Sequence, residues 1–145
     1  MNGGMELYLH MPFCVRKCAY CDFLSFPTDQ ETQNLYTRRL REDIDAMGKK
    51  YGDIPVDTIF IGGGTPSVPD SALIVGIMEH VRKAFHVAEG AEISMEANPG
   101  TVTREKLTDY RRAGINRLSF GLQSANDREL KLLGRIHTWA EFLES

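Results

Sequence analysis

VDTIFIGGG, residues 56–64, is a short apolar run rich in β-branched residues that stops abruptly at three glycines. A run of this kind, bounded by glycine, is typical of a buried strand that ends at a tight turn. Apolar residues then recur at three-to-four spacing after Asp70 or Ser71, either of which is a suitable helix cap. The buried stripe of that predicted helix consists of Leu73, Ile74, Ile77, Met78, Val81 and Phe85. Residues 56–85 therefore predict one strand followed by one helix.

The same alternation of strand and helix recurs along the chain. Further predicted strands cover residues 5–11, 91–97 and 116–122, and further predicted helices cover residues 30–48, 103–113 and 126–134. Short connections between alternating strands and helices are typical of right-handed βαβ units on a parallel sheet. The predicted fold class is therefore α/β, with about four βα units and a parallel sheet. A complete barrel of eight such units takes about 250 residues, so the 145 residues of this chain correspond to about half of one.

The composition excludes several classes of protein. Hydrophobic residues make up 42% and charged residues 26% of a chain with a net charge of −3, as in a globular protein. This charge provides no basic surface for nucleic acid or for an anionic membrane. The sequence has no apolar run of the roughly 18 residues needed to span a bilayer, and no export signal at residues 1–13. We therefore expect a cytoplasmic protein with no transmembrane segment and no nucleic-acid partner.

All three cysteines of the chain lie in one predicted loop after the first strand, as Cys14-x3-Cys18-x2-Cys21. In parallel α/β folds, ligands bind at this carboxyl edge of the strands. Three thiolates on one loop can converge on a metal centre. Iron–sulfur clusters commonly use four cysteines, so three would leave one iron without a protein ligand. Such an open iron can bind a substrate or cofactor.

Two other interpretations of the cysteines stay open. A zinc site would require a fourth ligand, for which His10 is the only nearby candidate. Ordinary buried cysteines are the other alternative, because free cysteine is often buried. Arg16 and Lys17 lie beside the cysteines in a polar loop, which argues against simple packing. A cluster with one open iron is the favoured hypothesis.

The cysteine-containing stretch YLHMPFCVRKCAYCDF, residues 8–23, resembles the cluster loop of radical S-adenosylmethionine (SAM) enzymes. It looks most like the branch that contains oxygen-independent coproporphyrinogen dehydrogenase and its haem-chaperone relatives. Further matching segments follow in the family's order: FIGGGTPS (60–67), SMEANPGT (94–101), RLSFGLQS (117–124) and LLGRIH (132–137). The resemblance covers essentially the whole chain. It implies the N-terminal half of a partial (β/α) radical SAM barrel, with residues 1–145 as a truncated core that lacks the rest of the barrel and the family's C-terminal domain.

The resemblance also implies the cofactors. In this family a [4Fe–4S] cluster, here on Cys14, Cys18 and Cys21, binds the amino and carboxylate groups of SAM at its open iron. One electron then splits the sulfonium bond and yields a 5′-deoxyadenosyl radical. The positions that match SAM contacts of the family are Tyr8, Tyr20, Gly63, Gly64, Thr65, Glu96, Gln123 and Arg135.

The chemistry of these residues agrees with such contacts but leaves alternatives. Glycines 63 and 64 let the backbone approach a ligand and offer N–H groups, although a tight turn would also explain them. Glu96 is a carboxylate on an apolar strand and therefore needs a cationic partner, either SAM or a structural salt bridge. For Arg135, the alternative to a SAM contact is an ordinary solvated side chain. His10 is expected on the same strand face as Tyr8, with no role beyond lining the site.

One position favours a branch of the family. The dehydrogenase has a fourth cysteine two residues after the third, where this chain has Phe23. This difference favours the haem chaperones, which bind haem and pass it to acceptor proteins. Haem, a haem-acceptor protein and an electron donor for the cluster are therefore expected partners. The alternatives are a coproporphyrinogen dehydrogenase and a non-enzymatic metal-binding half-domain. Whether the chain is an enzyme stays open, and no catalytic residue is assigned.

Overall fold

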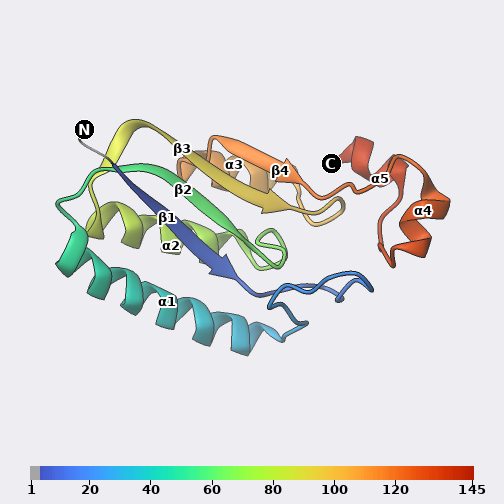
Figure 1. Cartoon of the computed structure of the whole chain (residues 1–145), viewed down its shortest axis with the longest axis horizontal. Helices are drawn as coiled ribbons and strands as arrows, with labels where there is room; N and C mark the ends of the chain where they lie inside the picture. Colours follow the sequence, from blue (N-terminus) through green and yellow to red (C-terminus); the bar gives the residue numbers. More distant parts are fainter. Residues whose placement is uncertain (1–3) are drawn as a thin grey trace.

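Residues 4–145, which the computed structural model describes, form a parallel four-stranded sheet in the order β1-β2-β3-β4 (Figure 1). The elements are β1 (Met5–Met11), α1 (Gln30–Tyr51), β2 (Val56–Gly63), α2 (Ser71–Ala84), β3 (Val87–Ala97), α3 (Arg104–Arg112), β4 (Arg117–Phe120), α4 (Asp127–Leu132) and α5 (Trp139–Glu144). This order confirms the predicted α/β class and its βα units. Each strand lies beside the next one in the sequence, as expected for right-handed βαβ units.

The core lies between one face of the sheet and the helices. Leu9, Ile61 and Met95 occupy one register across β1, β2 and β3, and all three are buried. The stripe predicted for α2 packs against them, and of its members only Leu73 stays half-buried. Asp70 is the helix cap, because its Oδ1 accepts a hydrogen bond from the N–H of Ala72 at 2.9 Å. Burial of this apolar layer is the main stabilising contribution to the fold.

Several predicted boundaries differ from the structure, and three of the differences have a visible cause. Helix α1 continues past residue 48, because Gly48 allows close packing: a Cβ there would lie 2.5 Å from that of Ala84. Strand β3 begins at Val87, before a bulge around Gly90, whose φ is +82°. Strand β4 ends at Phe120, where the carbonyl accepts from the N–H of Leu122 at 2.9 Å and turns the chain.

The opposite face of the sheet is open. Helices α1, α2 and α3 gather on one side of the strands, so that most side chains on the other side are exposed or half-buried (Figure 1). There the ring of Tyr8 stacks on that of Phe60, with centroids 6.1 Å apart. Among residues 4–145, no helix is both long and apolar enough to cross a membrane.

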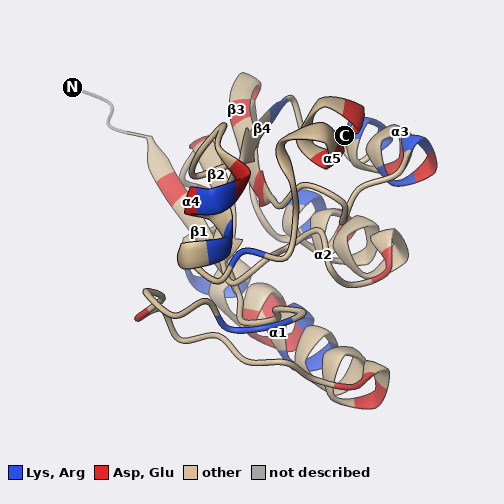
Figure 2. Cartoon of the chain, turned by 90° about the vertical axis from the view of Figure 1, so that its right-hand side faces the viewer, with Lys and Arg blue, Asp and Glu red and all other residues tan. Residues whose placement is uncertain are grey.

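The loops after the four strands gather at one end of the sheet, where α4 and α5 also lie (Figure 1). Figure 2 looks onto this end and shows basic and acidic residues interspersed along α1, α3 and α4. Parallel strands place all their carboxyl ends at the same edge. Segments that are far apart in the sequence therefore meet here.

Two leucines of helix α4 provide a matched test of how this helix packs against the rest of the chain. Leu130 is 1% exposed and Leu132 is 83% exposed, on the same short helix. We expect Leu130→Ala to lower the free energy of unfolding by about 2–5 kcal/mol, because it leaves a cavity. Leu132→Ala should change it by no more than about 0.5 kcal/mol. Urea denaturation of both variants measures the difference, and equal losses would contradict the docking of α4 through Leu130.

Candidate functional site

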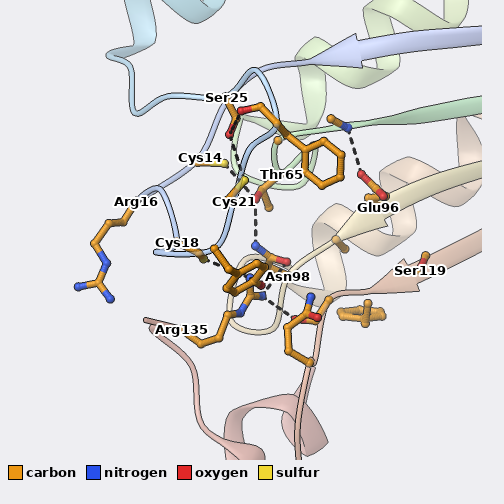
Figure 3. Close-up of a pocket in the computed structure, with 18 residues that line it drawn as sticks. Cys14, Arg16, Cys18, Cys21, Ser25, Thr65, Glu96, Asn98, Ser119 and Arg135 are labelled. Carbon is orange, nitrogen blue, oxygen red and sulfur yellow. Dashed lines mark hydrogen bonds between the residues drawn. The ribbon is translucent and has the colours of Figure 1, made fainter. Parts of the chain in front are cut away.

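A cavity of about 290 Å³ lies at the carboxyl edge of the sheet, with walls from the loops after all four strands and from the segment between α4 and α5 (Figure 3). All of the predicted site residues except Tyr8 line it. These are Cys14, Cys18, Tyr20, Cys21, Gly63, Gly64, Thr65, Glu96, Gln123 and Arg135. The topology thus brings together side chains separated by more than a hundred positions in the sequence.

The cysteine loop folds back on itself and presents three half-buried, free thiols. Its ends are joined by a hydrogen bond from the N–H of Cys14 to the carbonyl of Phe26, at 3.2 Å. Each sulfur has a different polar neighbour. The distances are 3.7 Å from Cys14 Sγ to Thr65 Oγ1, 3.5 Å from Cys18 Sγ to Arg135 Nη1 and 3.9 Å from Cys21 Sγ to Ser25 Oγ.

The donor set suits a cluster better than a single ion. Within residues 4–145, no three histidine, cysteine, aspartate or glutamate side chains are grouped tightly enough to hold one metal ion. A zinc ion requires its ligands around one point. The irons of a [4Fe–4S] cluster are separate, so each thiolate binds a different iron and the sulfurs stand apart. The three thiols around one cavity therefore fit an iron–sulfur cluster.

His10 is not free to serve as a fourth ligand. Its Nε2 lies 3.0 Å from the carbonyl oxygen of Leu24, which can only accept, so Nε2 carries the proton. Its Nδ1 then accepts from the hydroxyl of Tyr8, also at 3.0 Å. Both ring nitrogens are therefore occupied, and neither His10 nor Tyr8 lines the cavity. Burial, and to a lesser degree the Glu96 carboxylate, raise the pKa of Tyr8.

The backbone N–H groups of the turn after β2 are already hydrogen-bonded to other parts of the protein. The N–H groups of Gly63, Gly64 and Thr65 donate to Glu96 Oε2 at 3.0 Å, to the Met11 carbonyl at 2.8 Å and to the Phe13 carbonyl at 2.6 Å. The expectation that these glycines offer free N–H groups to a ligand was therefore wrong. Gly63 has a φ of +115°, and a Cβ on it would collide with the His10 ring, so the turn itself requires glycine.

Glu96 faces the cavity without a positive partner. Its Oε2 accepts the hydrogen bond from Gly63, and no lysine, arginine or histidine of the described chain forms an ion pair with it. The structural salt bridge considered for this residue is therefore not found in residues 4–145. A half-buried carboxylate in this position favours a cationic group in the cavity.

Arg135 extends from the segment between α4 and α5 into the cavity (Figure 3). Its Nη2 donates to the Gly121 carbonyl at 2.6 Å and to Asn98 Oδ1 at 3.0 Å, and its Nη1 reaches the Tyr20 hydroxyl at 3.4 Å. Its Nε is buried without a hydrogen-bond partner in the described chain. Burial raises the pKa of Tyr20 although the guanidinium opposes this, so the phenol stays protonated. Arg135 is therefore a fixed part of the cavity wall and not an ordinary solvated arginine.

The sequence reasoning missed two residues that support the site. The amide of Asn98 lies between Arg135 and Thr65, and donates from Nδ2 to Thr65 Oγ1 at 2.9 Å. Lys106 inserts its ammonium among four backbone carbonyls of the loops after β2 and β3, at 2.7–3.3 Å. Asn98 could have been found from its place directly after a strand, at the edge where ligands bind. Lys106 gave no such signal, because it lies within a predicted helix.

Comparison with known proteins identifies relatives of this chain. The family model of the Radical SAM superfamily matches residues 8–145. The heme chaperone HemW of Escherichia coli K12 is 45% identical over 139 residues, which cover 92% of this chain and 35% of that protein. HemW of Haemophilus influenzae is 41% identical over 94% of this chain and 37% of its own length. The chain therefore spans about a third of the length of the curated relatives it matches.

A solved structure shows the same fold. Coproporphyrinogen III oxidase (HemN) from Escherichia coli, described as a radical SAM enzyme, has a TM-score of 0.89 and 30% identity, covering 99% of this chain and 33% of that one. The match lies in the N-terminal part of the HemN fold and confirms the predicted partial barrel. Elp3 from Methanocaldococcus infernus, at a TM-score of 0.55 and 15% identity, shares the fold alone. The predicted resemblance is thus confirmed, and this chain belongs to the Radical SAM superfamily.

Proposed function

We propose that this chain holds a [4Fe–4S] cluster on Cys14, Cys18 and Cys21 with SAM at the open iron, and that it acts in haem binding and delivery. Membership of the superfamily implies the cluster and SAM as cofactors. The observation that carries the proposal is the set of three free thiols around one cavity, opposite the carboxylate of Glu96. In this proposal residues 1–145 make up a radical SAM core.

The residues of the chain would bind and orient the two cofactors. When bound and reduced, the cluster supplies the electron that cleaves the sulfonium bond of SAM. Glu96 has no cation of its own and is placed to accept a hydrogen bond from the amino group of SAM. Gly63 and Gly64 leave the wall beside it free of side chains. The polar groups of Gln123 and Arg135 face the same cavity.

The two aromatic residues would have different roles. Tyr20 lies in the wall, where its neutral ring provides a surface for the adenine of SAM. Tyr8 lies outside the cavity on the open face of the sheet. It would therefore meet only a ligand that extends from the cavity onto that face.

Haem handling is supported by the chemistry of the cysteine loop and by the relatives. Phe23 occupies the place of a fourth cysteine and lines the cavity with an exposed ring. Phe23 and Leu24 are 69% and 73% exposed, and provide apolar surface of the kind that a porphyrin contacts. The HemW relatives are named heme chaperones. A haem-acceptor protein and an electron donor would be the partners of this function.

The likeness to HemN favours a second candidate, oxidative decarboxylation of coproporphyrinogen. The two functions share the cluster and SAM, so the cavity alone supports both. They differ in product, because a decarboxylating enzyme releases carbon dioxide and a chaperone does not.

The cluster can be tested directly. After anaerobic reconstitution with iron and sulfide, the chain should bind about four irons. Cys18→Ala should lose the cluster, because two thiolates remain to hold it. Ser25→Ala, which removes the hydroxyl 3.9 Å from Cys21 Sγ but no ligand, should keep it. Metal analysis and low-temperature EPR measure both, and zinc in place of iron would contradict the proposal.

The role of Glu96 can be tested against a neighbour on the same strand. Glu96→Gln keeps an acceptor for the N–H of Gly63 but removes the negative charge, and should weaken SAM binding about 10- to 100-fold. Glu92→Gln is the control, because Glu92 is exposed and pairs with Arg117 at 3.5 Å. Isothermal titration of SAM into the reconstituted protein gives both affinities. Equal effects of the two variants would rule out a specific contact at Glu96.

Haem handling predicts a binding signal without turnover. Added haem should give a saturable shift of its Soret absorbance with the reconstituted chain. Coproporphyrinogen, SAM and a reductant should release no carbon dioxide. Release of carbon dioxide would favour the decarboxylating enzyme. A haem spectrum that stays unchanged in the presence of the cluster-containing chain would refute haem binding by this chain.

A further inference from the structure

The side-chain amide of Asn98 has one fixed orientation. Arg135 can only donate hydrogen bonds, so the group that faces its Nη2 at 3.0 Å is the carbonyl oxygen Oδ1. The Nδ2 group therefore faces Thr65, and donates to its hydroxyl at 2.9 Å. The backbone of Asn98 is fixed as well: its N–H donates to Ser67 Oγ at 3.3 Å, and its carbonyl accepts from Thr101 Oγ1 at 2.7 Å.

This orientation determines where the neighbouring protons point. Because the Thr65 hydroxyl accepts from Asn98, its own proton is free to point at Cys14 Sγ, 3.7 Å away. Arg135, held by the Asn98 oxygen, donates from Nη1 to Cys18 Sγ at 3.5 Å. A metal-bound thiolate has no proton and can only accept. With a cluster bound, two of the three sulfurs would thus receive hydrogen bonds from groups that Asn98 orients.

We propose that Asn98 is a positioning residue that raises the reduction potential of the cluster, through Thr65 at Cys14 and through Arg135 at Cys18. This inference rests on the proposed cluster. Reduction adds one negative charge to an iron–sulfur centre, and hydrogen bonds to its sulfurs stabilise that charge and tune the potential. Asn98 touches no sulfur itself, and acts by holding the two donors in place.

The measurement is a redox titration of the reconstituted chain without SAM, followed by EPR. Asn98→Ala should lower the equilibrium constant for one-electron reduction about tenfold, because the hydrogen bonds to two thiolates loosen. This corresponds to a shift of about 59 mV to more negative potential. Thr65→Val removes the donor at Cys14 and the acceptor of Asn98 Nδ2, but leaves Arg135 at Cys18, and should give part of the shift. Thr65→Ser should restore the wild-type value.

Asn116 is the matched control. Its amide also bridges two groups, accepting from the N–H of Ile93 and donating to the carbonyl of Ala91, both at 2.9 Å. It lies before β4, at the other end of the sheet from the cavity. Asn116→Ala should lower the stability of the chain and leave the potential unchanged. A shift as large as that of Asn98→Ala would overturn the inference.

The outcomes separate this inference from the proposed function. An Asn98→Ala variant that keeps its iron and its SAM-sensitive EPR signal, but has the wild-type potential, overturns the inference alone. A wild-type chain that takes up no cluster overturns both. If Asn98→Ala does not hold a cluster, Thr65→Val decides: an unchanged potential refutes the proposal, and a more negative potential with rescue by Thr65→Ser supports it.

Discussion

The hydrogen bonds of one guanidinium join the segments that build the cavity. Arg135 contacts Cys18 and Tyr20 in the loop after β1, Asn98 after β3 and Gly121 after β4. Asn98 in turn contacts Thr65 after β2. The loops of all four strands are therefore linked through a single side chain and its partner amide. Backbone bonds from Gly64 and Thr65 to Met11 and Phe13, and the ammonium of Lys106, add links among the first three loops.

This polar network depends on the apolar layer beneath it. The strands bury Leu9, Ile61 and Met95 against α2, and this packing fixes the strand ends from which the loops start. Hydrogen bonds in a half-buried network strengthen one another when every polar group has a partner. A buried polar group without a partner lowers the stability of the folded state. The division of roles is clear: one face of the sheet provides stability, and one edge provides chemistry.

The fold and the cysteine site could be predicted from local patterns, and the network could not. The run at 56–64, the helical stripe after it and the spacing of Cys14, Cys18 and Cys21 are all visible in short windows of sequence. The contact of Asn98 with Arg135 joins residues 37 positions apart, and no periodicity encodes it. For the same reason the hydrogen bond from the Gly63 N–H to Glu96, which joins β2 to β3, was not foreseen. This bond makes the Gly63 N–H unavailable to a ligand. Alternation placed Tyr8 and His10 on one face, but did not show that these two side chains bond to each other and stay outside the cavity.

The distance along the chain between Cys14 and Arg135 has a consequence for how the site is made. Translation at about 5–20 residues per second would expose the cysteine loop roughly ten seconds before Arg135 leaves the ribosome. During that interval Cys18 lacks the guanidinium that later contacts it, and the cavity lacks one wall. A nascent chain would therefore present its thiols unprotected, open to oxidation or to delivery of iron. Within residues 4–145, the segment around Arg135 is the last part of the cavity wall to be synthesised.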